Sequence, residues 1–385
     1  MAEIRRAYAR SGVDIEAGDR AVELMRSAVD STRRPEVLGG IGGFGGAIAI
    51  PPGYREPVIV SSTDGVGTKT AIAAAMHRWD TVGIDLVAMC ADDVVCTGAE
   101  PLGFLDYIAV GRLEPEAIAD LVAGVATGCR EAGCALVGGE TAEHPGMLEP
   151  GTFDLAGTCL GIAERADLLD GTAARDGDLI FGLPSSGLHS NGYSLVRSLL
   201  AEHAIPLERP YQEQLTMSLG DAGRDAVLAA EPEQALLTVG DVLLTPTRIY
   251  ARRLLEARRA LRAGGHDIRG MAHITGGGLP GNVPRALPEG MAARLEPGRW
   301  PMPSVMSLFA ALGGLADEEV RATFNGGLGM VLVVDPRAAS TLQAALPEAV
   351  LAGEVVPAGE VAAAGEVAAT DVGRRYVEAP LRVAV

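Results

Sequence analysis

Lysine is almost absent from this chain. Lys69 is the one lysine among 32 basic residues, and the other 31 are arginines. Because arginine fills nearly every cationic position, the single ammonium group suggests a place that needs a compact point charge on a flexible stem. Lys69 ends the run Thr63-Asp-Gly-Val-Gly-Thr-Lys69. We therefore take this run as the first candidate for a functional site.

Cysteine is scarce as well. The five cysteines form no Cys-x-x-Cys pair, which argues against a disulfide framework or a structural zinc site and favours a reducing cytoplasm. Long hydrophobic runs are also missing. Residues 37–54 are uncharged, but seven glycines and two prolines among them indicate loop and strand instead of a membrane span. Residues 1–12 carry four charged side chains and no apolar stretch, so no secretory signal is predicted.

The chain also lacks an excess of positive charge. The formal net charge of −18 opposes non-specific binding to nucleic acid or to anionic lipid. Phosphate groups can still be bound locally, through backbone amides, a few cations and a divalent metal. The length of 385 residues predicts two or three domains, and a charged, Asp-rich stretch at 164–178 places the boundary between residues 1–168 and 169–385.

One uncharged segment of the chain is rich in glycine. Six of the eight residues 39–46, here called the glycine loop, are glycines, so few Cβ atoms hold a bulky anion away from the backbone N–H groups. The loop matches G-x-G-x-x-G, but no strand precedes it and Pro51-Pro52 follows, which excludes a Rossmann fingerprint. Residues 67–70 lack the spacing of a P-loop. A linker would be polar, whereas this loop contains Ile41 and Phe44, so we favour a phosphate cradle.

Several carboxylates occur in apolar surroundings. Asp64 ends an apolar strand, a position that suits a metal ligand. Asp85 and Asp92 share one face of a predicted helix, with Asp93 adjacent, and the apolar flanks imply a buried helix whose acids point at something positive. Glu140 follows a strand and a Gly-Gly pair. Magnesium bound to ATP would use such groups.

The order of elements predicts an α/β protein. Predicted helices cover residues 19–30, 81–98, 115–132, 193–200 and 246–261, and predicted strands cover residues 57–62, 104–110, 135–137, 153–162, 178–183 and 330–334. The tetrapeptide Ala-Gly-Glu-Val recurs at 352, 358 and 364. Three copies are too few for a solenoid, so we interpret them as turns or local low complexity.

His189 lies in a Ser/Gly/Asn turn before a predicted helix, where side chains often face a ligand. Capping of the helix explains Ser190 and Asn191 but not the imidazole. A Ser-His hydrolase using Ser186 is disfavoured because neither neighbouring serine lies in G-x-S-x-G.

At this point many ordered motifs resemble one family, the phosphoribosylformylglycinamidine cyclo-ligases, also called aminoimidazole ribonucleotide synthetases. The resemblance extends from about residue 8 to residue 334. Its motifs are Ser11-Gly-Val-Asp-Ile, Thr63-Asp-Gly-Val-Gly-Thr-Lys69, Gly83-Ile-Asp-Leu-Val-Ala-Met-Cys90, Phe104-Leu-Asp-Tyr107, Gly138-Gly-Glu-Thr-Ala-Glu143, Ser185-Ser-Gly-Leu-His-Ser-Asn-Gly192, His273-Ile-Thr-Gly-Gly-Gly278 and Thr323-Phe-Asn325.

The resemblance implies a two-domain α/β (α+β) fold, with an N-terminal ATP-binding and dimerisation domain and a C-terminal α/β domain that completes the substrate site. In the implied homodimer, the N-terminal sheets pair into a barrel. The implied reaction, in purine biosynthesis, closes formylglycinamidine ribonucleotide to aminoimidazole ribonucleotide and releases ADP and phosphate. Nucleic acid and membrane are not expected partners.

The resemblance also assigns roles to residues. The implied catalytic residues are Lys69, His189 and Asp64, and Mg²⁺ is assigned to Asp64, Asp93 and Glu140. ATP is assigned to Arg26, Gly40, Gly42, Gly43, Phe44, Gly45 and Thr68. The substrate is assigned to Thr141, Ser190, Asn191, Thr275, Gly276 and Gly277.

Two alternatives stay open at the level of sequence. The chain could be a selenophosphate synthetase or thiamine-phosphate kinase relative, although no cysteine precedes or lies within the glycine loop and the Ser185–Asn191 turn fits the cyclo-ligases better. It could also be a catalytically silent nucleotide-binding scaffold. Loss of Asp64 or Lys69 would indicate that, and both are present.

Overall fold

The computed structural model describes residues 12–40, 42–363 and 375–382, and the chain divides into two compact units. Unit 1 extends to Val95 and continues with Ala99–Ala166, and unit 2 comprises Cys96–Gly98 and Asp167–Val385. This division lies two residues from the boundary predicted after residue 168. The predictions for residues 1–11 and for the Ala-Gly-Glu-Val copy at 364 lie outside the described residues.

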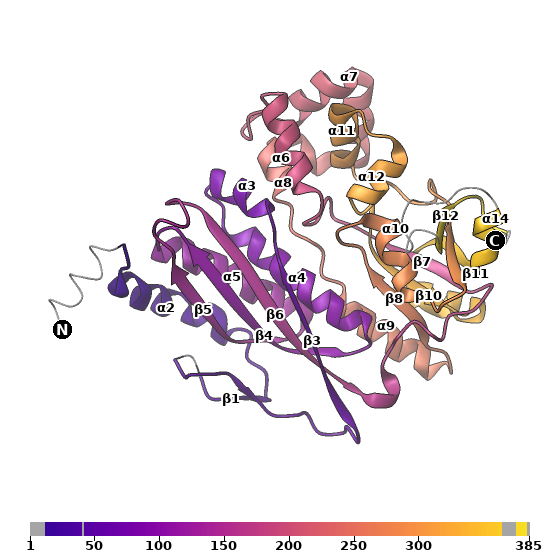
Figure 1. Ribbon diagram of the computed structural model, residues 1–385, viewed down its shortest axis with the longest axis horizontal. Helices are drawn as coiled ribbons and strands as arrows, with labels where there is room; N and C mark the ends of the chain where they lie inside the picture. The colour runs from indigo at the N-terminus through magenta and orange to yellow at the C-terminus, as the bar shows by residue number, and fades with distance from the viewer. Residues whose placement is uncertain (1–11, 41, 364–374, 383–385) are drawn as a thin grey trace. The chain divides into compact units, whose positions relative to one another are not determined.

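Unit 1 is built on a four-stranded sheet in the order β3-β6-β4-β5, in which only β4 and β5 run parallel (Figure 1). A two-stranded hairpin, β1-β2, carries the glycine loop. The elements are α2 (Ile15–Asp30), β1 (Val37–Leu38), β2 (Ala47–Ile48), β3 (Pro57–Gly65), α3 (Lys69–Ala75), α4 (Asp80–Cys96), β4 (Glu100–Val110), α5 (Pro115–Ala132), β5 (Ala135–Glu143), β6 (Phe153–Glu164) and η1 (Arg165–Asp167).

One face of the unit 1 sheet is covered by helices and the other is open. On the covered face, α4 approaches β6 so closely that a Cβ at Gly157 would lie 3.0 Å from Leu86. Helices α4 and α5 cross through glycines, because a Cβ at Gly124 would meet the backbone of Asp80 at 1.8 Å. Helix α5 has Pro115 in its first turn and ends at Gly133 with φ +83°, which confirms its predicted limits.

Strand β5 is longer than predicted. The sequence placed its end at Val137, before the Gly-Gly pair, but the strand continues to Glu143. Gly139 lies opposite Asp106 of β4, and a Cβ there would lie 1.8 Å from Oδ1 of Asp106. The glycine therefore makes room for a neighbouring carboxylate instead of ending the strand.

Unit 2 contains a six-stranded sheet in the order β12-β9-β11-β7-β10-β8, with β10 buried along its whole length. Only the β9-β12 pair is parallel. The elements are β7 (Leu179–Pro184), α6 (Tyr193–Glu202), α7 (Tyr211–Ala230), η2 (Pro232–Leu236), α8 (Val239–Leu243), α9 (Ala251–Ala263), β8 (Ile268–His273), α10 (Gly278–Asn282), η3 (Val283–Ala286), β9 (Met291–Leu295), α11 (Ser304–Gly313), α12 (Asp317–Thr323), β10 (Leu328–Val334), η4 (Pro336–Ala338), α13 (Ala339–Ala345), β11 (Val350–Pro357), α14 (Ala358–Ala363) and β12 (Tyr376–Glu378).

Two predictions in unit 2 are wrong. The helix predicted over 246–261 begins only at Ala251, after an irregular segment in which Tyr250 Oη donates to the backbone oxygen of Pro184. The Ala-Gly-Glu-Val copies at 352 and 358 are not turns, since the first lies in strand β11 and the second lies in helix α14. The same tetrapeptide thus takes two conformations, because tertiary packing overrides local propensity.

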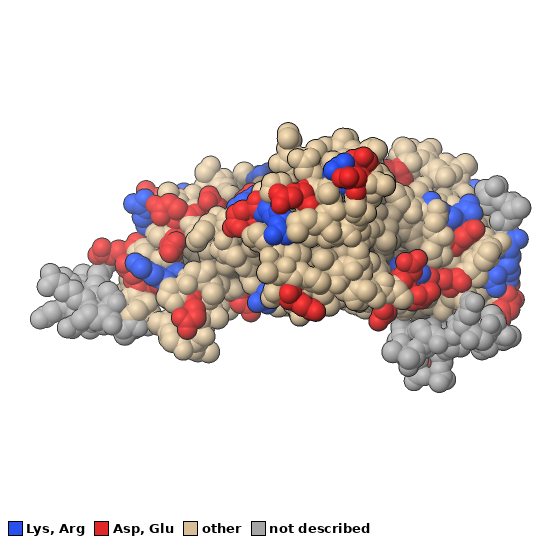
Figure 2. All heavy atoms as spheres, turned by 90° about the horizontal axis from the view of Figure 1, so that it is seen from above, with Lys and Arg blue, Asp and Glu red and all other residues tan. Residues whose placement is uncertain are grey.

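The five cysteines are free thiols, as expected from their spacing. The described part of the chain contains no helix with both the length and the hydropathy that a membrane span requires. On the face drawn in Figure 2, acidic and basic side chains are interspersed.

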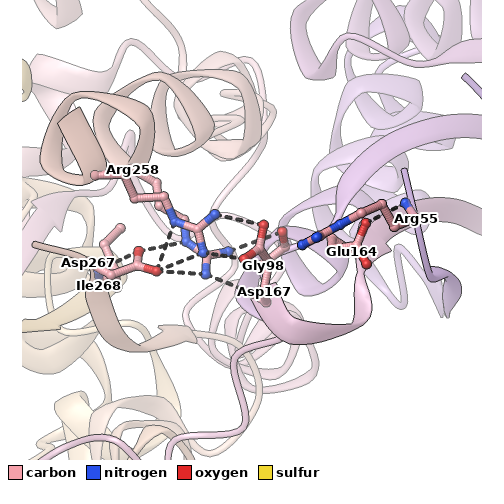
Figure 3. Close-up of polar contacts among 8 residues, drawn as sticks. Arg55, Gly98, Glu164, Asp167, Arg258, Asp267 and Ile268 are labelled. Atoms are coloured by element: carbon pink, nitrogen blue, oxygen red, sulfur yellow. Dashed lines mark hydrogen bonds and ion pairs between the residues drawn. The ribbon is translucent and has the colours of Figure 1, made fainter. Parts of the chain in front are cut away.

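Arginine is used structurally in unit 2, where a buried cluster centres on Arg258 of α9 (Figure 3). Its guanidinium donates to both carboxylate oxygens of Asp267, at 2.7 and 3.0 Å, and to the backbone oxygens of Gly98 and Asp167. Lysine could not make this set of contacts, because it lacks the planar fork of donors. Such sites help to explain the preference for arginine.

Replacing Arg258 by lysine should lower the free energy of unfolding by about 2–3 kcal/mol, since buried acceptors lose their donors. The control is Arg253→Lys on the same helix, whose side chain is 53% exposed and pairs with Glu348. That change should cost no more than about 1 kcal/mol. Urea denaturation of both variants checks the prediction, and equal losses would contradict it.

Candidate active site

Unit 1 contains a cavity of about 810 Å³ beneath the glycine loop. Its volume is in the range of small-molecule sites. Helix α2 contributes mainly apolar side chains, and strands β4 and β5 contribute Leu105, Asp106 and residues 135–141. The cavity therefore joins the predicted phosphate cradle to two strands of the sheet.

The glycine loop is anchored at one end and open along most of its length. A Cβ at Gly46 would lie 2.4 Å from the backbone oxygen of Val137, so the end of the loop packs directly on β5. At Gly40, Gly42 and Gly45, a Cβ would meet no atom within 4 Å. The loop amides are thus accessible to an anion, and Phe44 is fully exposed.

The predicted ATP ligands divide into two groups. Gly40, Gly42, Gly43, Phe44 and Gly45 line the cavity, whereas Arg26 and Thr68 do not. Arg26 is exposed on α2 next to Met25, which does line the cavity, and Thr68 is exposed at the start of α3.

Asp106 is a cavity residue that the sequence reasoning did not select, although it lies in the quoted motif Phe104-Leu-Asp-Tyr107. Its carboxylate reaches over Gly139, and protein surrounds it on nearly every side while the cavity still gives it some access to water. This burial raises the pKa of Asp106 to about 7. The Gly-Gly pair on the neighbouring strand was the signal that could have revealed it.

The raised pKa predicts a pH-dependent stability. Between about pH 4 and pH 7 the folded protein holds a proton on Asp106 that the unfolded chain releases, so this residue makes stability fall as the pH rises through that window. Asp106→Asn should therefore be more stable than wild type at pH 8, by about 1–3 kcal/mol after allowance for water in the cavity, and equally stable at pH 4. Urea denaturation at both pH values measures this. The same difference at both would contradict it.

Lys69 lies outside the cavity lining, in a buried ion pair. Its Nζ is 2.7 Å from Oδ2 of Asp85 on α4, and both side chains are 0% exposed. Burial lowers the pKa of Lys69, while Asp85 opposes that shift. The expectation that the acids of this helix point at something positive is confirmed for Asp85.

Asp64 and Asp93 both lie close to Cys90 of α4, on the covered face of the sheet. Oγ of Ser62 donates to Oδ2 of Asp93 at 3.4 Å, and Oδ1 of Asp64 accepts from the N–H of Gly65 at 2.7 Å. Burial raises the pKa of the Cys90 thiol to about 12, and the charges of Asp64 and Asp93 contribute to that shift.

Glu140 is placed differently. It pairs with Tyr107, one position beyond the Asp106–Gly139 pair, so its side chain points to the opposite face from that of Asp106. Asp64 and Asp106 both pair with Gly157 of β6, so the three residues form one row across the sheet. The side chain of Asp64 therefore points to the covered face, as that of Asp106 does. Within the described residues no group of three or more His, Cys, Asp or Glu side chains is arranged to hold a metal.

In unit 2, His189 adopts a left-handed backbone with φ +59° and is 1% exposed. Its Nε2 accepts a hydrogen bond from the N–H of Ser186 at 3.1 Å, which requires a neutral imidazole with the proton on Nδ1. The ring centre lies 6.3 Å from that of Tyr250. His189 therefore holds the turn that contains it.

The two predicted substrate loops of unit 2 are joined. Nδ2 of Asn191 donates to the backbone oxygen of Ile274, next to Thr275. The hydroxyl oxygens of Ser185 and Ser190 are buried and have no hydrogen-bond partner among the described residues. Buried polar atoms without partners are rare and commonly mark a ligand site.

Two asparagines that sequence reasoning missed fix these loops. Asn282 Nδ2 lies within hydrogen-bond distance of the backbone oxygens of Thr275, Gly276 and Gly278. Asn325 donates to the oxygen of Gly187 and accepts from the N–H of Gly327. Both are almost completely buried, and only the motif containing Asn325 gave a signal.

Two sequence families match separate parts of the chain. Residues 47–163 match the family "AIR synthase related protein, N-terminal domain", and residues 175–371 match "AIR synthase related protein, C-terminal domain". Among solved structures, thiamine-monophosphate kinase from Stenotrophomonas maltophilia gives a TM-score of 0.56 at 18% identity, covering 88% of this chain and 93% of that one. The hydrogenase maturation protein HypE in complex with ATP gives 0.56 at 17%, covering 89% and 88%. These two establish a shared fold only.

Curated sequences are much more similar. Phosphoribosylformylglycinamidine cyclo-ligase from Myxococcus xanthus is 51% identical over 328 residues, which cover 85% of this chain and 88% of that protein. The protein of the same name from Geobacillus kaustophilus is 50% identical over 356 residues, which cover 91% and 95%. With half of all positions identical over almost the whole length, the chain belongs to the phosphoribosylformylglycinamidine cyclo-ligase family.

Proposed function

We propose that this protein uses ATP to close formylglycinamidine ribonucleotide to aminoimidazole ribonucleotide, with release of ADP and phosphate, in de novo purine biosynthesis. The observation that carries the proposal is the 50% identity to cyclo-ligases across about nine-tenths of the chain. The cavity beneath an open glycine loop supports it, since a nucleotide needs such a site. The free thiols are consistent with action in the cytoplasm.

The reaction has to turn a poor leaving group into a good one. The terminal phosphoryl group of ATP is transferred to the formyl oxygen, an amidine nitrogen attacks the activated carbon, and phosphate leaves as the ring closes. Phosphoryl transfer depends on positioning and on neutralising charge. The amides of the glycine loop would hold the triphosphate, and Arg26, next to the cavity residue Met25, and Thr68 are proposed to contact it.

Mg²⁺ would be held by Asp64 and Asp93, where it would neutralise the transferring phosphoryl group. Their shared neighbourhood suits a metal that is bound by one or two carboxylates together with phosphate oxygens. Glu140 points to the opposite face of the sheet from Asp64 and so cannot share that ion, and we propose that it lies beside the triphosphate in the cavity that it lines. Lys69 is proposed to act electrostatically from its buried pair.

The loops of unit 2 are proposed to bind the substrate. Ser190 and Asn191, with Thr275, Gly276 and Gly277, would contact the ribonucleotide, together with Thr141 of unit 1. The unpartnered hydroxyl of Ser190 supports this role. Because Nε2 of His189 already accepts a hydrogen bond, the geometry favours a role in orienting the formyl oxygen over proton transfer at that atom.

The assembly is proposed to be a homodimer in which two unit 1 sheets face each other in a barrel. The open face of the sheet supports this, with Ile59 55% and Tyr107 42% exposed. Ile59→Asp should convert the dimer to a monomer, because a buried charge would oppose the contact. Light scattering after gel filtration measures this. The control is Ile50→Asp, equally exposed at 55% but outside the sheet, which should stay dimeric. A monomeric wild type would contradict the assembly.

The function is tested by incubating the purified protein with formylglycinamidine ribonucleotide and ATP-Mg²⁺. The expected result is a diazotisable aminoimidazole, with ADP and phosphate formed in equal amounts. Thiamine phosphate, supplied in parallel, should give no product. ATP hydrolysis without aminoimidazole, or phosphorylation of thiamine phosphate, would overturn the proposal.

A further inference from the structure

We propose that Asp106 binds the amidine group of the substrate, as a specificity residue in the cavity beneath the glycine loop. This inference rests on the proposed function, because the amidine belongs to the substrate of that reaction. It gives a role to a cavity residue outside the predicted catalytic, ATP-binding, substrate-binding and metal-binding sets.

The position of Asp106 is built into the sheet. It lies in one row with Asp64, Gly157 and Gly139, so its carboxylate and that of Asp64 lie on the same face. The side chains of Phe104 and Leu86 fill the space over Gly157, whereas at Gly139 a Cβ would lie 1.8 Å from Oδ1 of Asp106. The row therefore leaves space for one carboxylate at the floor of the cavity.

Asp106 is also the most shielded carboxylate of the cavity. The other two acidic residues in its lining, Asp30 and Glu140, are exposed. Among the described residues, no side chain donates a hydrogen bond to the carboxylate of Asp106, which is bonded only by its own backbone N–H. A shielded acceptor at a cavity floor calls for a donor from the ligand.

ATP and the amidine substrate are the two ligands that could donate a hydrogen bond to Asp106, and their charges distinguish them. A carboxylate would repel the phosphates of ATP, whereas an amidinium is a planar cation with N–H groups on two nitrogens that match two carboxylate oxygens. The glycine loop and Asp106 line the same cavity, so a substrate whose formyl group meets the terminal phosphate there has its amidine nearby. The contact would also hold the amidine beside the activated carbon, where one of its nitrogens attacks after giving up a proton to the carboxylate.

The experiment compares the amidine substrate with its amide analogue, formylglycinamide ribonucleotide, used as a competitive inhibitor. Wild type should bind the amide at least about 10²-fold more weakly, because its oxygen would face the carboxylate. In Asp106→Asn the KM for the amidine should rise about 10- to 100-fold, and the preference for amidine over amide should largely disappear. The KM for ATP should change by less than about threefold.

Two further variants keep the result interpretable. Asp30→Asn changes an exposed carboxylate of the same cavity and should leave the amidine preference unchanged. Asp106→Ala should lose the preference as Asp106→Asn does, so the test stands if either variant folds. An unchanged preference in a folded Asp106 variant that turns over would overturn this inference alone. A wild type that makes no aminoimidazole would overturn the proposed function, and this inference with it.

Discussion

Lys69→Met should lower the free energy of unfolding by about 3–5 kcal/mol. The change leaves Asp85 as a completely buried carboxylate without its cation, and loss of one partner of a buried ion pair is strongly destabilising. Urea denaturation provides the measurement. Such a loss is a large part of the stability of a typical domain, so the variant should be poorly folded at growth temperature.

The double variant Lys69→Met/Asp85→Leu separates structure from catalysis. It removes both charges and should recover most of the lost stability, because apolar groups can replace a buried pair. If Lys69 also stabilises the transferring phosphoryl group, the stable double variant should still turn over about 10²-fold more slowly than wild type. A single variant as stable as wild type would contradict the buried pair, and normal turnover in the double variant would remove Lys69 from the catalytic residues.

Asp64→Asn should reduce turnover by about 10²- to 10³-fold with little change in stability. The amide oxygen can still accept the hydrogen bond from Gly65, but the charge that would hold Mg²⁺ is gone. Steady-state kinetics at several Mg²⁺ concentrations measure the effect, and part of the loss should be recovered at high Mg²⁺.

A matched control for Asp64→Asn lies on the neighbouring strand. Oδ1 of Asp154 accepts from the N–H of Leu155 at 2.9 Å, the same local contact that Asp64 makes at 2.7 Å. Asp154 is exposed and does not line the cavity, so Asp154→Asn should leave turnover unchanged. Equal activity of the two variants would exclude a role for Asp64 as a metal ligand.

Local signals predicted much of the first unit. Pro115 and Gly133 delimit α5 because each residue fixes its own backbone geometry. The strands at 57–62, 104–110 and 153–162 were located from apolar runs, and the structure extends each of them. The function could not be inferred from such local signals. It was inferred from the ordered motifs between Thr63 and Asn325, which resemble one family.

The remaining features depend on contacts between distant residues. The partner of Lys69 is sixteen positions away on another helix, so its burial could not be seen in the glycine-rich run itself. The length of β5 and the placement of Asp106 both follow from pairing between β4 and β5. Glu140 looked like a strand-end acid, but alternation along that strand turns it away from Asp64.

In the proposed reaction, ATP passes its terminal phosphoryl group to the formyl oxygen of the substrate. This transfer is tested most directly with substrate that carries ¹⁸O in the formyl group. During ring closure that oxygen leaves with the phosphoryl group, so each phosphate released should contain one ¹⁸O atom, detectable by mass spectrometry. Phosphate without the label, formed together with aminoimidazole, would contradict the account.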